Sequence, residues 1–332
     1  MTLISLISSN PKKNLLLLFF LTIFLGTGIS NFKLDASSDT LLLENDPDLK
    51  LFRENSEKYG SNDFLIVTFT PKDELLSGSS ILLIKKIVNE IASFNRVESV
   101  LSLLDVPLLE NNPNISLSDV AENVETLNSE NPNLELAKRV FSSNDVYRNL
   151  LISEDLNTTA FQVTLKRNLN YENLINQRYL IYDLTTPDKE QRLININELI
   201  EQEKNMVSIE DEKLVSSMRN LLDSYQNFGE FFLGGGAMIT VDTIRFISQD
   251  LTVFGISVLL IFTFVLSFLF RNLIWVFMPL FTALVTSAIC MGLVGWFGWK
   301  VTVVSANFIS ILMIISISLM VHLIVRYQEL GI

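Results

Sequence analysis

The polar residues that could do chemistry in this chain lie in its last apolar run, Val301–Val325, which has no Asp, Glu, Lys or Arg. The run holds one histidine and several small polar residues that could carry protons or substrate: Asn307, Ser310, Ser316, Ser318 and His322. Polar side chains in a membrane helix mark transport paths, but they also let helices approach and hydrogen-bond. The second role is the commoner one. We therefore favour helix contact and keep a proton or substrate path as the alternative.

His322 is the only histidine, and its imidazole is the only side chain of the run that titrates near neutral pH. It lies about one turn before Arg326, close to the end of the helix expected at the cytoplasm. An interfacial histidine that hydrogen-bonds to a neighbouring helix is therefore favoured over a proton carrier. Asn307, Ser310 and Ser318 recur at helical spacing, which predicts that they share one face.

Other kinds of active site are missing from the sequence. There is no G-x-x-x-x-G-K-[ST] loop for ATP, and a Ser-His-Asp site would need a histidine outside the membrane. The single cysteine, Cys290, lies in an apolar run and allows neither an internal disulfide nor a cysteine metal site. The acids Asp35 and Asp39, and those from Glu210 to Glu212, are expected to be solvated surface or helix caps. We expect no enzyme activity, no cofactor and no metal.

Three long apolar runs make up the last third of the chain. They cover residues 251–270, 273–297 and 301–325, and short turns around Arg271 and Lys300 separate them. A helix needs about 20 apolar residues to cross a hydrocarbon core of roughly 30 Å. All three runs are long enough and none shows a polar stripe, so we predict three membrane helices.

A fourth apolar run follows Lys12 and Lys13 near the N-terminus. Two interpretations compete for it, an uncleaved membrane helix and a cleaved signal peptide. Its end lacks the small-residue motif at which signal peptides are cut, so we favour a membrane helix at 14–31. In both cases the segment that follows is expected to be exported.

The positive charges orient these helices. If the helices alternate in direction, only Lys300 falls on one side, and the other side receives Lys12, Lys13, Arg271 and Arg326. The positive-inside rule puts the second set, with the ends 1–13 and 326–332, in the cytoplasm. Residues 32–250 then lie outside. Of the net charge of −12, the parts before and after this segment contribute +2 each, so it carries −16, which argues against nucleic acid as a partner.

The exported segment has the pattern of a mixed α/β domain. Runs rich in β-branched and aromatic residues predict strands at 64–69, 97–103, 159–165 and 230–233. Apolar residues at helical spacing predict helices at 79–94, 116–127, 133–150, 170–184, 188–204, 210–225 and 238–249. The pair spanning about 170–204 is expected to form a charged hairpin. Because strand–helix–strand occurs twice, we predict a ferredoxin-like split βαβ sheet.

This order of segments resembles the first half of a resistance-nodulation-division (RND) transporter, and more narrowly the type named after mycobacterial membrane protein large (MMPL). The resemblance covers most of the chain, and its motifs are strong in combination rather than singly. It rests on Asp35-Ala-Ser-Ser-Asp39, on Leu233-Gly-Gly-Gly-Ala-Met238 followed by Asp250, on the turn Phe270–Leu273, and on the stretch Gly298–Ser310 that leads to Val321–Glu329.

The family has two halves, each with six membrane helices and one exported loop. We therefore expect this chain, which ends after its fourth helix, to be a fragment whose partner is the missing C-terminal half. In proton-coupled members an acidic residue of the fourth helix carries the relay, and the matching position here is Ser318. Three accounts follow: the second half carries the relay, His322 substitutes, or the protein is not driven by protons.

The resemblance implies an α-helical membrane protein with an exported α+β, ferredoxin-like porter domain. The expected function is secondary active export of lipophilic or amphiphilic molecules from a bacterial cell inner membrane, with the large domain in the periplasm. The implied partners are the lipid bilayer and a lipophilic substrate, and a homo-oligomer stays open. The missing acid favours one rival, a non-transporting lipid sensor or scaffold of the sterol-sensing type. A membrane-anchored module that binds a basic partner is a weaker one.

Overall fold

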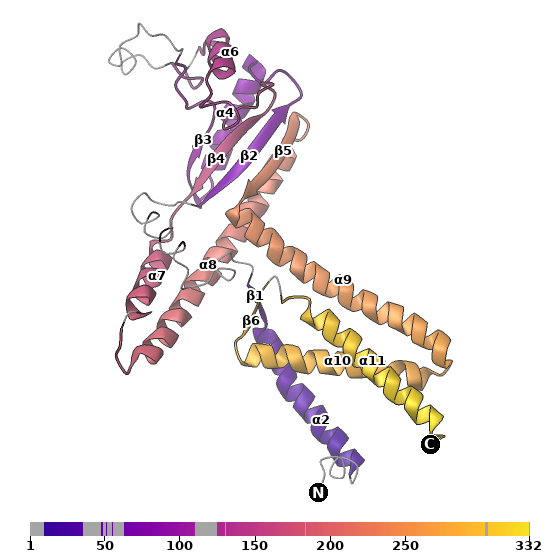
Figure 1. The fold of residues 1–332 in the computed structure, drawn as a ribbon. Coiled ribbons are helices and arrows are strands. Elements are labelled where there is room, and N and C mark those ends of the chain that lie inside the picture. Colours follow the sequence, from indigo (N-terminus) through magenta and orange to yellow (C-terminus); the bar gives the residue numbers. More distant parts are fainter. Residues whose placement is uncertain are drawn as a thin grey trace. The chain divides into compact units, whose positions relative to one another are not determined.

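The computed structural model describes residues 10–35, 63–109, 125–129, 131–182, 184–302 and 305–331, together with Asp48, Leu51 and Asn55. The chain divides into two compact units, whose elements are labelled in Figure 1. The membrane unit comprises Met1–Asp46 and Asp242–Ile332, and the sheet unit comprises Pro47–Val241.

The sheet unit is built on four antiparallel strands in the order β3-β4-β2-β5. They are β2 (Phe64–Pro71), β3 (Val97–Leu101), β4 (Thr159–Leu165) and β5 (Gly229–Gly235). Along β4 the side chains of Phe161, Val163 and Leu165 are buried, and the residues between them are more exposed. This period of two gives the sheet one core face.

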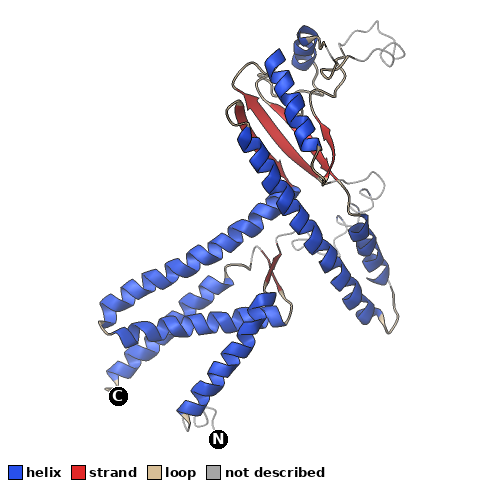
Figure 2. Ribbon diagram, turned by 180° about the vertical axis from the view of Figure 1, so that it is seen from behind, coloured by secondary structure: helices blue, strands red, loops and turns tan. Residues whose placement is uncertain are grey.

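Two helices cover that face (Figure 2). Helix α4 (Gly78–Ala92) connects β2 to β3, and the second half of α8 (Lys189–Ser224) precedes β5. Ser77 caps the start of helix α4, because its Oγ accepts from the Ser80 N–H at 3.3 Å. The helix buries Ile84, Ile87 and Ile91 completely. Full burial of each such side chain stabilises the fold by about 1.5–3 kcal/mol.

The helical hairpin differs from the sequence prediction. Helix α7 (Leu169–Tyr182) packs against α8, but α8 continues without a break through the two helices predicted at 188–204 and 210–225. The intervening residues, 205–209, contain neither glycine nor proline, so nothing in the local sequence stops the helix.

Two other predicted elements are shorter in the structure. The helix predicted at 133–150 is α6 (Leu134–Ser143), which ends because Asn144 is extended and its Oδ1 accepts from the Val146 N–H at 2.9 Å. Strand β3 ends at Leu101 because Ser102 turns the chain through hydrogen bonds to Asp105. Most of the helix predicted at 116–127 lies outside the described residues, and residues 125–127 are not helical.

The described residues of the membrane unit include four helices long and apolar enough to cross a membrane. These are α2 (Pro11–Gly26) with its 3-10 extension η1 (Thr27–Asn31), α9 (Gly236–Phe270), α10 (Leu273–Trp296) and α11 (Phe308–Glu329). Helix α2 begins three residues before the predicted start, with Pro11 in the first turn, where a missing N–H costs nothing. Helix α9 begins earlier than 251 because the helix predicted at 238–249 continues into it.

The last apolar run, residues 301–325, does not begin as a helix. Lys300–Thr302 forms the short strand β6, which pairs in parallel with β1 (Lys33–Asp35). The β-branched residues Val301 and Thr302 favour this extended form. Ser305 then closes a turn, its Oγ accepting from the Thr302 N–H at 3.0 Å, and α11 starts at Phe308 rather than at 301.

The first and third membrane helices cross at glycines. A Cβ atom added to Gly292 would lie 1.9 Å from the Leu25 carbonyl oxygen, and one added to Gly295 would lie 1.9 Å from the Gly28 oxygen. Such approach of two backbones is possible only where side chains are absent, and it is a common way for membrane helices to associate.

Candidate functional site

Helix α11, which carries the predicted transport residues, packs through an apolar face. Ile309, Met313, Ile317 and Ile324 are buried at intervals of four or seven residues. The first three share a cluster with Ala283 of α10 and its neighbours on that helix. The helix side opposite this face is exposed within the unit.

The structure separates the five predicted site residues. Asn307 is the exposed residue that precedes α11 and belongs to no helix face, so it does not form one face with Ser310 and Ser318 as the sequence predicts. Ser310 and Ser316 are half-buried on the two margins of the apolar face. Ser318 and His322 are exposed and lie one turn apart on the opposite side.

Helix α10 contributes a buried polar group that sequence reasoning missed. Ser287 is 6% exposed, and its Oγ has no hydrogen-bond partner among the described residues. It lies one turn after Ala283, on the side of α10 that faces α11. The apolar residues around Ser287 in the sequence gave no signal for it, since a lone serine is common in membrane helices.

Asp35 and Lys300 form an ion pair where β1 meets β6. The Lys300 Nζ lies 3.4 Å from the Asp35 Oδ2, and the Asp35 side chain is only 7% exposed. The prediction that Asp35 is solvated surface is therefore wrong, because pairing of β1 with β6 buries it. Asp39, its predicted companion, lies outside the described residues. The pair ties the segment after the first span to the turn between the third and fourth.

The described residues offer no site for a metal ion. Nowhere in that part of the chain do three His, Cys, Asp or Glu side chains come together in a way that could hold one. Cys290 is a free thiol, half-buried in α10.

Comparison with known protein families gives a match to part of this chain. The model of the MMPL family matches residues 213–330, from the second half of α8 through β5, α9 and α10 to the end of α11. This part of the chain is similar to the MMPL family. The MMPL region contains Lys300, Ser287 and all five predicted site residues, whereas Asp35 and strands β2 to β4 lie before it. No curated protein matches the chain significantly.

Proposed function

We propose that the protein is an RND-type exporter that moves lipophilic or amphiphilic molecules across or out of a bacterial inner membrane by secondary active transport. The MMPL match over residues 213–330 carries this proposal, because it includes α9, α10 and α11. These are three of the four described helices that could span a membrane. The match does not favour the alternative of a lipid sensor or scaffold.

The sheet unit is proposed to be an exported porter domain of the ferredoxin-like type. Its strand order, β3-β4-β2-β5, with α4 and α8 as the two connecting helices, supports this assignment. The distribution of basic residues supports export, because only Lys300 lies opposite Lys12, Lys13, Arg271 and Arg326 when the spans alternate.

Energy coupling needs a group in the transport path that changes its charge. In the part of α11 before Arg326, His322 is the only side chain of an ionisable type, and the Ser318 hydroxyl stays uncharged. We propose that a proton relay, if it uses this chain, runs through His322. Otherwise the carboxylate lies in another part of the transporter, or the coupling ion is not a proton.

Efflux of a lipophilic fluorescent dye tests this function. Cells that express the protein are loaded with dye, and loss of fluorescence is followed with and without a protonophore. Export is expected in cells with the protein and not in cells with an empty vector, and the protonophore should abolish it. No efflux in either sample would contradict the exporter proposal and support the sensor or scaffold.

The variant His322→Gln tests the role of the imidazole separately. If His322 carries protons, this variant loses protonophore-sensitive efflux, whereas Ser316→Ala in the same helix keeps it. Efflux that is unchanged in His322→Gln would exclude the imidazole from the relay while leaving export itself established. Membrane levels of both variants, measured by immunoblot, control for misfolding.

A further inference from the structure

One face of helix α8 is apolar and exposed. The side chains of Leu199, Met206 and Ile209 are 48%, 52% and 51% exposed. Their intervals of seven and three residues put them on one side of the helix, over a length of about 15 Å. Helix α7 packs against another side of α8, where Ile196 and Ile200 are buried (Figure 1). The three exposed residues therefore form a stripe that α7 leaves uncovered.

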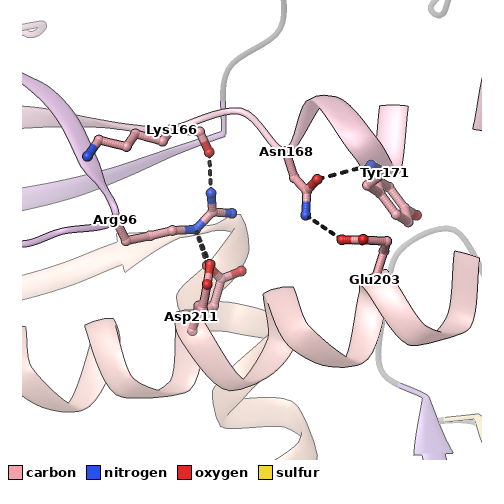
Figure 3. Close-up of polar contacts among 7 residues, drawn as sticks. Arg96, Lys166, Asn168, Tyr171, Glu203 and Asp211 are labelled. Carbon is pink, nitrogen blue, oxygen red and sulfur yellow. Dashed lines mark hydrogen bonds and ion pairs between the residues drawn. The ribbon is translucent and has the colours of Figure 1, made fainter. Parts of the chain in front are cut away.

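Contacts beside the stripe hold this part of α8 in place (Figure 3). The Arg96 Nε donates to the Asp211 Oδ1 at 3.1 Å, which joins α8 to the turn before β3. Asn168 caps α7 by accepting from the Tyr171 N–H at 3.0 Å, and its Nδ2 donates to the Glu203 Oε2 at 3.2 Å. A surface that is held in shape before binding loses less entropy when a partner docks.

Glutamates line both edges of the stripe. Glu198 and Glu212 lie along one edge, because residues at multiples of seven follow one line along a helix. Glu203 and Glu210 lie along the other edge for the same reason. The Glu198 and Glu212 side chains are exposed and make no ion pair with any described residue. Glu210 is 60% exposed and lies 3.9 Å from the Arg96 Nε. Both edges therefore present carboxylates to solvent.

This part of α8 is acidic as a whole. Residues 195–213 hold six acids and two lysines. Lys204 lies on the side of the helix opposite Met206, and Lys213 comes one turn after Ile209, at the end of the stripe. No lysine or arginine of α8 therefore lies between the three apolar side chains.

The two rows of glutamates decide what can cover the stripe. A second copy of the chain would bring glutamates against glutamates, and like charges across a helix pair are destabilising. An anionic membrane surface would be repelled in the same way. A helix that has apolar residues on one side and Lys or Arg along the edges of that side would cover the apolar residues and pair with the carboxylates.

We propose that this stripe docks a basic amphipathic helix of a partner protein. The apolar side of that helix covers Leu199, Met206 and Ile209, and its Lys or Arg side chains pair with the glutamates at the edges. Because the stripe is short, the complex is expected to be weak and transient. The proposal does not depend on transport. A failure of the docking test leaves the export proposal standing, and a failure of the efflux test leaves this one standing.

Docking is measured by fluorescence anisotropy with the full chain in nanodiscs of neutral phosphatidylcholine, and empty nanodiscs correct for binding to lipid. The probe is a labelled helical peptide of three heptads, with Leu at the two seam positions and Lys at the flanking positions. A second peptide has Glu in place of the flanking Lys, and a third has the basic sequence scrambled. The basic peptide is expected to bind about tenfold or more tightly than either control, because it alone combines an apolar side with opposite charge. Equal binding of the Glu peptide would overturn the charge complementarity, and equal binding of the scrambled peptide would overturn the apolar contact.

Substitutions in the stripe locate the site. Leu199→Ser with Ile209→Ser should weaken binding of the basic peptide about tenfold or more, because two of the three apolar contacts are lost. The control, Leu180→Ser with Ile194→Ser, replaces side chains that are 69% and 53% exposed elsewhere on the hairpin, and it should leave the affinity within about twofold. Equal affinities of the two double variants would overturn the assignment. The melting temperature of each variant checks that the fold is intact.

Charge variants test the glutamate rows. Glu198→Gln with Glu212→Gln should weaken binding of the basic peptide severalfold, and the difference from wild type should shrink in high salt. The control, Glu190→Gln with Glu230→Gln, makes the same charge change at exposed positions outside the stripe and should have a smaller effect. An equal loss in both double variants would mean that net charge alone attracts the peptide, which would contradict a docking site at the stripe.

The oligomeric state tests the other occupant, a second copy of the chain. Light scattering should give the same mass for wild type and for Leu199→Ser with Ile209→Ser. A dimer of wild type that this double variant loses would overturn the partner helix in favour of self-association through the stripe.

Discussion

Gly292→Ala should separate the first and third membrane helices, because α10 has no room for a side chain at this position. An added Cβ would lie 1.9 Å from the Leu25 carbonyl oxygen and 2.6 Å from the carbonyl carbon. Real Cβ atoms do not come closer than 3.0 Å to such neighbours. Both neighbours are backbone atoms, so no rotamer change relieves the clash, and α2 and α10 must move apart by about 1 Å.

The cost of this movement combines strain with lost contacts. Overpacking a close contact costs about 1–3 kcal/mol. Beside the glycine crossing, the rings of Phe24 and Trp296 stack with centroids 5.3 Å apart, and such a pair contributes about 0.5–1.5 kcal/mol. A gap of about 1 Å removes up to half of the dispersion energy of each contact it opens. We expect Gly292→Ala to destabilise the membrane unit by about 2 kcal/mol or more.

Equilibrium unfolding in mixed detergent micelles, titrated with SDS, measures this loss. Gly26→Ala and Gly255→Ala are matched controls, because a Cβ added at either glycine meets nothing within 4 Å. Both controls should unfold at the wild-type midpoint or slightly above it, since alanine favours helix by up to about 1 kcal/mol over glycine. If Gly292→Ala unfolds at the same midpoint as the controls, the crossing of α2 and α10 at this glycine is refuted.

Three further substitutions probe other contacts. Asn272→Ala removes an N-cap whose Oδ1 accepts from the Ile274 N–H at 3.0 Å, and it should cost about 1 kcal/mol in the same SDS titration, with Asn272→Ser close to wild type. Asp35→Asn should lower the free energy of unfolding by about 1–3 kcal/mol, because it removes the carboxylate that pairs with Lys300. Adding Lys300→Met to this variant should restore part of the lost stability, and the double-mutant cycle gives the coupling between the two side chains. Burial raises the pKa of Asp211, against the opposing effect of Arg96, so the folded sheet unit holds this proton more tightly than the unfolded chain. The bound proton therefore stabilises the folded sheet unit at pH values below the ordinary aspartate pKa. This stabilisation is lost as pH rises through the raised pKa of Asp211. Asp211→Asn should make the melting temperature depend less on pH over this range. A pH dependence equal to that of wild type would contradict burial of the carboxyl group.

Local patterns in the sequence located the strands and the apolar helices. Strand β4 has the bounds that alternation predicts, 159–165, because every second side chain enters one core. Helix ends were less predictable. Where a breaker is absent, as at 205–209, a helix continues past the predicted boundary. At Lys300–Thr302, pairing with a strand from the other end of the chain overrides an apolar run that by composition alone would be helical.

The sequence identified polar residues of α11 but not the environment of each. Helical spacing alone could not show that Asn307 precedes the helix, because the start of α11 depends on pairing of β6 with β1. Burial of Asp35 has the same origin, since its partner Lys300 is 265 residues away in the sequence. Ser287 is buried one turn after Ala283, which packs against α11, and no local pattern encodes this contact between helices.

The exposed side of α11 constrains any relay through this helix. Ser318 and His322 share that side with Ile311, Ile315 and Leu319, which are 55%, 58% and 62% exposed. An ionisable residue in a membrane helix normally faces protein or a water-filled cavity rather than lipid. Under the proposed function, other helices of the transporter therefore cover this side and supply the partner of His322. Loss of coupling in His322→Gln would then report on that contact and not on the packing of α11 against α10, which uses the opposite face.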